Sequence, residues 1–295
     1  IADRQIAPSL LRFGTEDQRQ KYLPKIAKGE CYFAIGLSEP DAGSDLAAVR
    51  TSAEKVEGGW RLNGRKVWTS GAHKAHAFFV LARTSPVVGR NRHDGLTQFL
   101  VHLDWEGVTI RPILLISGEH HFNEVIFDDV FIPDGNVLGE AGDGWRTATA
   151  ELAFERSGPE RILSTFALLT TLVDAVANLS PDHHAMLDLE LGPVAAPRWG
   201  LLQLSLAVAG AIARHELPAV AASLVKDLGT QLEIAIIDTA RTLGRVEADP
   251  TADPNGPMRL ARLLADSVLQ APGFSLRGGT NEILRGMVAR GLGLR

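Results

Sequence analysis

The spacing of apolar residues changes once along this 295-residue chain, and that change limits the folds the chain can adopt. Between Cys31 and about Pro133, β-forming residues alternate with polar ones in short runs such as CYFAIGLS, AFFVLART and EVIFDDVFI. From Trp145 to the C-terminus, apolar residues recur at helical spacing. Alternation predicts half-buried strands, and helical spacing predicts helices that pack by one face. We therefore expect an α+β protein in which a β domain precedes a helical bundle.

The strand region also contains a hairpin signal. Asn63-Gly64 separates EGGWRL from RKVWTS, and Asn-Gly between apolar alternations is typical of a two-residue turn. Several short antiparallel strands over about a hundred residues favour a β-barrel or a sandwich.

Helices are predicted on both sides of this region. A short surface helix is expected between Gly14 and Gly29, with Thr15 as N-cap and an interruption near Pro24. The helical spacing in the second half predicts helices near 145–157, 159–179, 197–214, 217–245, 257–269 and 280–291. Three prolines, a glycine and three acids in Val246–Pro257 predict a loop.

Composition excludes several classes of protein. A net charge of −5 gives no electrostatic footprint for nucleic acid. The single cysteine, Cys31, cannot form an internal disulfide and is expected to be a small buried residue, and no Cys/His cluster has zinc-ligand spacing. No apolar run approaches the ~20 residues that span a bilayer, and the start lacks the order of a signal peptide, so we expect a cytoplasmic protein. Because the chain begins without Met, we also expect a preceding N-terminal region.

Two segments of the strand region are candidates for ligand binding. In SEPDAGSD, Ser44 has the position of an N-cap of a short helix entered through Gly43, whose amides would attract a phosphate; an ordinary capped turn is the alternative. In KVWTSG, Trp68 and Ser70 share one face of a strand end. They would suit a flat heteroaromatic ligand, whereas a core aromatic is the alternative.

The helix that begins at Trp145 carries a carboxylate on an apolar stripe. Trp145, Ala148, Leu152 and Glu155 recur at helical spacing, and such a carboxylate is costly to bury unless it is paired or used. The alternative is a solvated Glu155 that pairs with a neighbouring arginine.

The residues that follow predict how this helix ends. Pro159 cannot donate a hydrogen bond to the carbonyl of Glu155, so the backbone should open there. Ser157 and Glu160 have the spacing of a capping box for a new helix. That assigns Glu160 a structural role and makes Glu155 the candidate for chemistry.

A glycine pair near the C-terminus is a further candidate. In RGGTNEILRG, Gly278 and Gly279 allow close approach of a ligand, and Thr280 opens a helix with Glu282 in its first turn. A flexible turn between two helices is the alternative.

Five segments in series resemble the acyl-CoA dehydrogenases. They are SEPDAGSD, KVWTSG, IFDDVFIPDGNVLGE, GDGW and RGGTNEILR, and the resemblance covers nearly the whole chain. It implies a central antiparallel β-barrel followed by an all-α four-helix bundle. The implied domains are a remnant of an N-terminal helical domain at 1–29, the barrel at 30–135 and the bundle at 136–295.

The resemblance also implies an FAD site. Leu37, Ser38, Trp68 and Ser70 would face the flavin, Gly43 and Ser44 would lie near phosphate or pantetheine, and Thr280 and Glu282 would reach the cofactor from the C-terminal side.

In this family a glutamate removes the α-proton of the acyl-CoA while the flavin accepts hydride from the β-carbon. Most members carry that base just before the Gly-Thr of the terminal motif, where this chain has Gly278. A minority carry it as Glu-Arg on the helix after the barrel. Counting from Gly144, the matching pair is Glu155-Arg156. The resemblance makes Glu155 the base and Arg156 a CoA contact, with an ion pair inside the bundle as the alternative for Arg156.

Two motifs of the family are not intact. The family's Arg-x-x-Phe-Gly and Gly-Gly-x-Gly segments reach the FAD of a neighbouring subunit, and here those regions are LGPVAAPRWG and TLGRVEADPT. We expect an acyl-CoA dehydrogenase that passes electrons to an electron-transferring flavoprotein and forms a homo- or hetero-oligomer, either a dimer or a tetramer. The alternatives are a non-catalytic or half-site partner subunit and a flavin oxidase of the same fold.

Overall fold

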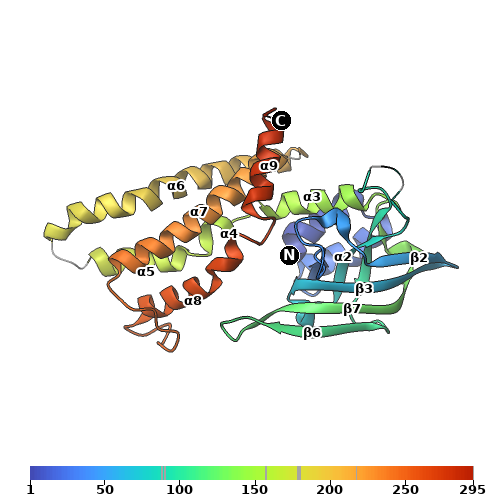
Figure 1. Ribbon diagram of the computed structural model, residues 1–295, viewed down its shortest axis with the longest axis horizontal. Coiled ribbons are helices and arrows are strands. Elements are labelled where there is room, and N and C mark those ends of the chain that lie inside the picture. Colours follow the sequence, from blue (N-terminus) through green and yellow to red (C-terminus); the bar gives the residue numbers. More distant parts are fainter. Residues whose placement is uncertain (88, 90, 157, 178–180, 217, 295) are drawn as a thin grey trace. The chain divides into compact units, whose positions relative to one another are not determined.

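The computed structural model describes residues 1–295 apart from 88, 90, 157, 178–180, 217 and 295, and it does not describe the side chains of 153, 160 and 181–188. The described chain divides into two compact units, Ile1–Glu155 and Arg156–Arg295 (Figure 1). The predicted domain boundaries at 29/30 and 135/136 stay predictions.

The first unit opens with three helical segments, η1 (Ala2–Ile6), α1 (Ala7–Phe13) and α2 (Glu16–Ala27). Thr15 caps α2 through a capping box with Gln18, which confirms the predicted start. The predicted interruption near Pro24 is wrong, because α2 continues through it to Ala27.

Eight strands follow. They are β1 (Phe33–Gly36), β2 (Ser52–Val56), β3 (Gly59–Ser70), β4 (Ala77–Arg83), β5 (Leu96–His102), β6 (Val108–Leu114), β7 (His120–Pro133) and β8 (Val137–Leu138). Short 3-10 helices η2 (Leu46–Ala48), η3 (Ala72–Lys74) and η4 (Asp134–Asn136) interrupt the connections.

The sheet differs from the predicted antiparallel barrel. Its strand order is β6-β7-β3-β2-β4-β5-β8, with β1 paired to β4, and the described strands leave it open between β6 and β8. It is also mixed, because β1 runs parallel to β4, and β2 meets β4 in parallel at Ser52 and Arg83. Alternation along a strand predicts which faces are buried but not which strand lies alongside, so this part of the prediction could not be read locally.

The hairpin predicted at Asn63-Gly64 is wrong. Strand β3 runs straight through these residues, and the register with β7 shifts between Leu62 and Gly64. A Cβ at Gly64 would lie 2.7 Å from the Thr51 Cα, and its φ is +141°. This glycine therefore permits a close approach of two backbones within a strand, not a turn.

Strands β4 and β5 are buried on both faces. On one face Phe78, Val80 and Phe99 belong to an apolar core that they form with side chains of the other strands. On the other face, Phe79 and Leu100 pack with Ile6 and Leu10 of the N-terminal helices. Ala148 of α3 (Gly144–Arg156) packs against Leu81 of β4 and Leu96 of β5.

The second unit is helical. It contains α4 (Glu160–Leu163), α5 (Phe166–Ala177), α6 (Pro181–Ala213), α7 (Ala219–Leu243), α8 (Arg259–Phe274) and α9 (Asn281–Gly291). Helix α7 contacts each of the other five. Its Val225, Leu232 and Ile236 lie in the largest apolar core of the chain.

Two predicted helices are corrected. The segment 159–179 forms two helices, α4 and α5, with Ser164 and Thr165 between them. The helix predicted at 197–214 begins at Pro181 and includes Pro193 and Pro197. The predicted loop Val246–Pro257 is confirmed, since it lies between α7 and α8. No described helix is both long enough and apolar enough to cross a membrane.

The start of α3 supplies a test of how this helix is docked on the sheet. A Cβ at Gly144 would lie 2.6 Å from the Thr97 nitrogen and 2.7 Å from the Leu96 carbonyl oxygen. Because both atoms are backbone, we expect Gly144→Ala to lower the free energy of unfolding by about 1–3 kcal/mol in denaturant titrations. The matched control is Gly135→Ala, where a Cβ meets nothing within 4 Å. Equal stability of the two variants would contradict close docking of α3.

Candidate active site

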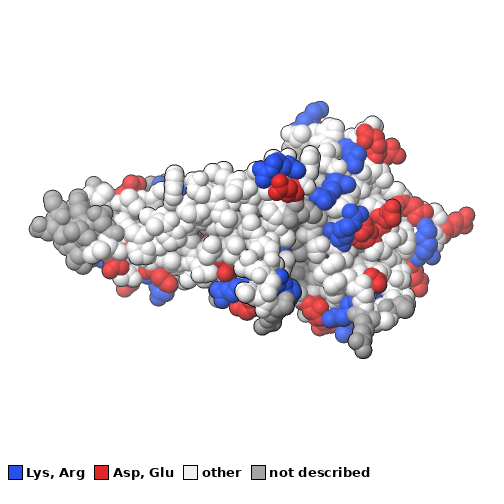
Figure 2. All heavy atoms as spheres, turned by 90° about the horizontal axis from the view of Figure 1, so that it is seen from above, with Lys and Arg blue, Asp and Glu red and all other residues white. Residues whose placement is uncertain are grey.

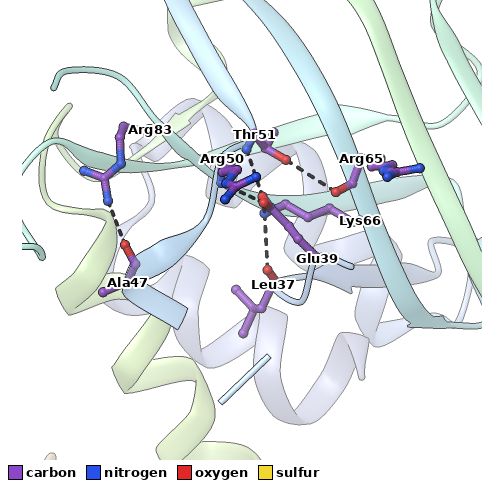
Figure 3. A network of polar contacts seen from close by, with 8 residues as sticks. All are labelled: Leu37, Glu39, Ala47, Arg50, Thr51, Arg65, Lys66 and Arg83. Atoms are coloured by element: carbon purple, nitrogen blue, oxygen red, sulfur yellow. Dashed lines mark hydrogen bonds and ion pairs between the residues drawn. The ribbon is translucent and has the colours of Figure 1, made fainter. Parts of the chain in front are cut away.

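The segment after β1 is fastened to β3 by a buried lysine (Figure 3). Lys66, whose side chain is fully buried, donates hydrogen bonds to the Leu37 carbonyl at 3.2 Å and to Glu39 Oε1 at 2.7 Å. The Val67 amide donates to the Ser38 carbonyl at 3.0 Å. Leu37 and Ser38 are therefore held beside the end of β3.

Glu39 also closes the loop that follows it. Its carboxylate accepts hydrogen bonds from the amides of Arg50 at 2.7 Å and Thr51 at 2.9 Å (Figure 3). Burial by itself raises the pKa of Glu39, but the charge and hydrogen bond of Lys66 and the two amides outweigh it, so the pKa is lowered. Burial lowers the pKa of Lys66 to about 8 against the opposing effect of Glu39.

The predicted cofactor wall lies at the end of β3. Trp68 has φ 58°, a left-handed conformation that is strained for a residue with a bulky side chain. Its indole is 58% exposed and meets only the edge of Phe122 among the described aromatic rings. Ser70 lies two residues on and is half-buried. The strain and exposure are typical of a functional residue and do not fit the alternative of a core aromatic.

A buried hydroxyl lies between these two residues. Thr69 Oγ1 has no hydrogen-bond partner among the described residues, while the Thr69 carbonyl accepts from Asn123 Nδ2 at 3.0 Å. The Thr69 hydroxyl is not accessible to a ligand, but the exposed ring of Trp68, with Ser70 on the same strand and Ser38 held against Val67, fits a flat heteroaromatic ligand with polar edges, such as a flavin. No metal or charged ligand is required by this set of side chains.

The predicted cap at Ser44 is wrong. The short 3-10 helix Leu46–Ala48 begins after Asp45, with no capping side chain. Gly43 and Ser44 are exposed and belong to the loop that Glu39 closes. One turn of 3-10 helix does not provide the aligned amides of a longer helix, so the predicted phosphate site lacks that support.

Helix α3 carries a buried carboxyl group that the sequence prediction missed. Glu151 is fully buried and accepts a hydrogen bond from Gln98 Nε2 of β5 at 2.6 Å. Burial, with a smaller contribution from the charge of Glu155, raises the pKa of Glu151 to about 8. The available signal was its spacing of three residues from Ala148, which places it on the buried face.

Glu155 lies one turn further along and is half-buried. Its backbone carbonyl accepts a hydrogen bond from Arg4 at 3.4 Å. Helix α3 ends at Arg156, close to where Pro159 predicted an opening. The predicted capping box lies outside the described residues, because neither Ser157 nor the Glu160 side chain is described.

In the helical unit, Arg156 binds the C-terminal glycine turn. Its Nε donates to the Gly278 carbonyl at 3.1 Å, and the side chain is 6% exposed. Gly278 and Gly279 have φ values of 67° and 96°, which glycine adopts without strain. The turn is thereby fixed against a buried guanidinium.

Helix α9 starts as predicted after this turn. Thr280 is its N-cap and accepts a hydrogen bond from the Ile283 amide. Glu282 is exposed in the first turn. Hydrogen bonds from its own amide and from Thr280 lower the pKa of Glu282, as expected for an acid at a helix N-terminus.

The Lys66–Glu39 pair supplies the first test of the site. Lys66→Met removes the partner of a buried carboxylate and should lower the free energy of unfolding by about 3–5 kcal/mol in denaturant titrations. The control is Lys55→Met, because Lys55 pairs with Asp134 and both side chains are more than half exposed; it should cost less than about 1 kcal/mol. A loss no larger than that of the control would contradict the structural role of the pair.

Glu151 supplies a pH test. Burial raises the pKa of Glu151 from the ordinary value of 4.5 to about 8. The protonated carboxyl group therefore contributes fully to the free energy of unfolding below pH 4.5, and this contribution is lost as pH rises towards 8. The slope is at most about 1.4 kcal/mol per pH unit. Glu151→Gln cannot lose a proton, so its stability relative to the wild type should improve between pH 5 and pH 8 in urea titrations. A stability difference that does not vary with pH, as expected for the exposed control Glu140→Gln, would argue against a buried proton on Glu151.

Comparisons with known proteins agree with this geometry. Family models described as "Acyl-CoA dehydrogenase, N-terminal domain" and "Acyl-CoA dehydrogenase, middle domain" match residues 1–30 and 34–130. Acyl-CoA dehydrogenase FadE29 of Mycobacterium tuberculosis is 32% identical over 297 residues, which is 96% of this chain and 73% of FadE29.

Other matches cover less of the relative. Acyl-CoA dehydrogenase IpdE1 of M. tuberculosis is 50% identical over 156 residues, which is 53% of this chain and 40% of IpdE1. This chain spans less than half the length of three such relatives. The ChsE4–ChsE5 complex of M. tuberculosis has a similar structure, with a TM-score of 0.80, 26% identity and coverage of 100% of this chain and 77% of that chain.

The match to FadE29 covers 96% of this chain and therefore extends over both units. This chain therefore belongs to the acyl-CoA dehydrogenase family, whose members are FAD-dependent oxidoreductases of lipid metabolism.

Proposed function

We propose that this chain is the catalytic part of an FAD-dependent acyl-CoA dehydrogenase that converts an acyl-CoA thioester into the trans-2-enoyl-CoA. The observation that carries the proposal is the exposed, strained Trp68, with Ser70 two residues on and Ser38 hydrogen-bonded to the neighbouring Val67 amide. A flat ring with hydrogen-bonding edges would bury this indole. When bound, FAD supplies the acceptor for the β-hydride.

The residues assigned to the cofactor are those that the resemblance implies. Leu37, Ser38, Trp68 and Ser70 would contact the flavin, with Gly43 near its phosphates, and Thr280 and Glu282 would contact it from the start of α9. Ser44, Arg156 and Gly278 are assigned to the substrate. The buried bond from Arg156 to Gly278 supports joint action of these two, because it fixes the carbonyl and the turn together.

Glu155 is proposed as the base that removes the α-proton. Support comes from its half-buried position in the last turn of α3 and from Gly278, which has no side chain where most members carry the base. With φ at 67°, position 278 would also be strained by a glutamate. A half-buried carboxylate lies near a low-dielectric interior while remaining accessible to a substrate.

The arrangement of the assembled protein is also a proposal. We assign α5, α6, α7 and α8 to the family's four-helix bundle, since α7 contacts the other three. The face of the helical unit seen in Figure 2 has few charged side chains, and Leu189, Trp199 and Leu206 of α6 are exposed. Such a surface suits a subunit contact.

Substitution of Glu155 tests the proposed base. Glu155→Gln in the full-length protein, produced with any partner subunit it needs, should lower acyl-CoA turnover by at least about a thousandfold while FAD stays bound, because the amide cannot accept the α-proton. Absorbance of the bound flavin and turnover with an artificial electron acceptor provide the measurement. The control is Glu140→Gln, an exposed carboxylate. Undiminished turnover would refute the assignment, and loss in Glu160→Gln alone would move the role to Glu160.

The second candidate function is a half-site or non-catalytic partner subunit. It is favoured by the altered segments LGPVAAPRWG and TLGRVEADPT, which lie in α6 and at the end of α7. A relative described as a ChsE4–ChsE5 complex has unlike chains in its name. Under this function the purified chain is colourless unless it is produced with a partner, whereas a self-sufficient dehydrogenase is yellow.

Electron transfer to an electron-transferring flavoprotein, and not to oxygen, is expected, so turnover should release no peroxide.

A further inference from the structure

Three polar residues on one face of α7 are buried without contributing to the apolar core. Lys226, Thr230 and Glu233 are spaced by four and three residues, so they lie on one face of the helix. None is more than 1% exposed. Burying an ammonium, a hydroxyl and a carboxylate is costly unless each forms specific bonds.

All three side chains bind the same irregular segment, Phe274–Asn281. Lys226 Nζ donates to the Ser275 carbonyl at 3.3 Å and to Asn281 Oδ1 at 2.8 Å. Thr230 Oγ1 donates to the Phe274 carbonyl at 3.2 Å. The Glu233 carboxylate accepts from the Arg277 guanidinium. These three side chains therefore contact both ends and the middle of this segment.

Further groups hold the same segment within the helical unit. Arg156 Nε donates to the Gly278 carbonyl at 3.1 Å, and Ser164 Oγ donates to Glu233. Three backbone carbonyls of this segment therefore accept hydrogen bonds from side chains, those of Phe274, Ser275 and Gly278. Without these bonds the pair Gly278-Gly279 would be the most flexible part of the chain between α8 and α9.

We propose that Lys226, Thr230 and Glu233 are positioning residues that preorganise the segment Phe274–Asn281 for the cofactor. This inference rests on the proposed function, in which Thr280 and Glu282 contact FAD. A purely stabilising role explains the network less well, because apolar residues at these helix positions would pack without the cost of burying charge. The polar bonds instead select one conformation of a segment that contains two glycines.

Thr230 offers the cleanest test, since Thr230→Val preserves shape and removes one hydrogen bond. Amide hydrogen exchange of the protein without FAD should show residues 276–283 exchanging at least about fivefold faster, while the Leu232–Ala240 amides of α7 are unchanged. FAD binding, followed by quenching of flavin fluorescence, should weaken by roughly three- to tenfold. Glu233→Gln should loosen the same segment, because it weakens the bond to Arg277.

Two matched variants control for general destabilisation. Thr230→Ser keeps the hydroxyl and should restore wild-type exchange and affinity. Thr242→Val changes an exposed threonine of the same helix, whose hydroxyl donates to the Asp238 carbonyl, and should alter neither measurement.

The outcomes separate this inference from the proposed function. Faster exchange throughout α7 and the turn together, or no change in the turn, would overturn the positioning role. Local loosening with unchanged FAD affinity would overturn it as well, while leaving the dehydrogenase proposal intact. A wild-type protein that binds no FAD, alone or with a partner, would overturn both.

Discussion

The buried ion pair between Lys66 and Glu39 is the interaction on which the sheet side of the site depends. Lys66 lies on β3 two residues before the strained Trp68, and it binds both Glu39 and the carbonyl of Leu37. Through Glu39 the same pair reaches the amides of Arg50 and Thr51. The Lys66 ammonium thus links the end of β3 to both ends of the loop from Leu37 to Thr51. Removing Lys66 leaves the buried Glu39 carboxylate without its counter-ion, so substitution of one partner alone is strongly destabilising.

The helical unit repeats this design with different residues. A buried lysine, Lys226, again donates to a backbone carbonyl and to a side chain of an irregular segment, and Arg156 donates to the carbonyl of Gly278. In both units the regular elements supply buried charged donors, and the segments that carry the assigned ligand contacts supply the acceptors. Buried charge of this kind favours a single loop geometry more than it favours overall stability.

Local sequence signals predicted the features that depend on neighbours in the chain. The caps at Thr15 and Thr280 are found where side-chain spacing placed them, and the change from strands to helices occurs where the apolar period changes. The Asn63-Gly64 signal failed because Gly64 allows its backbone to lie close to that of Thr51, which lies in the connection before β2. Glu151 and Lys66 were missed for the same reason, since Gln98 and Glu39 are distant in sequence. The open, mixed sheet depends on strand partners that alternation does not specify.

The central claim is that this chain, with FAD bound, oxidises an acyl-CoA thioester. The most direct measurement is an anaerobic titration of the flavin-loaded protein with a panel of acyl-CoAs, followed by the visible absorbance of the flavin. The account predicts stoichiometric bleaching by at least one saturated thioester and none by the matching enoyl-CoA. A flavin that stays oxidised while saturated acyl-CoAs demonstrably bind would contradict it.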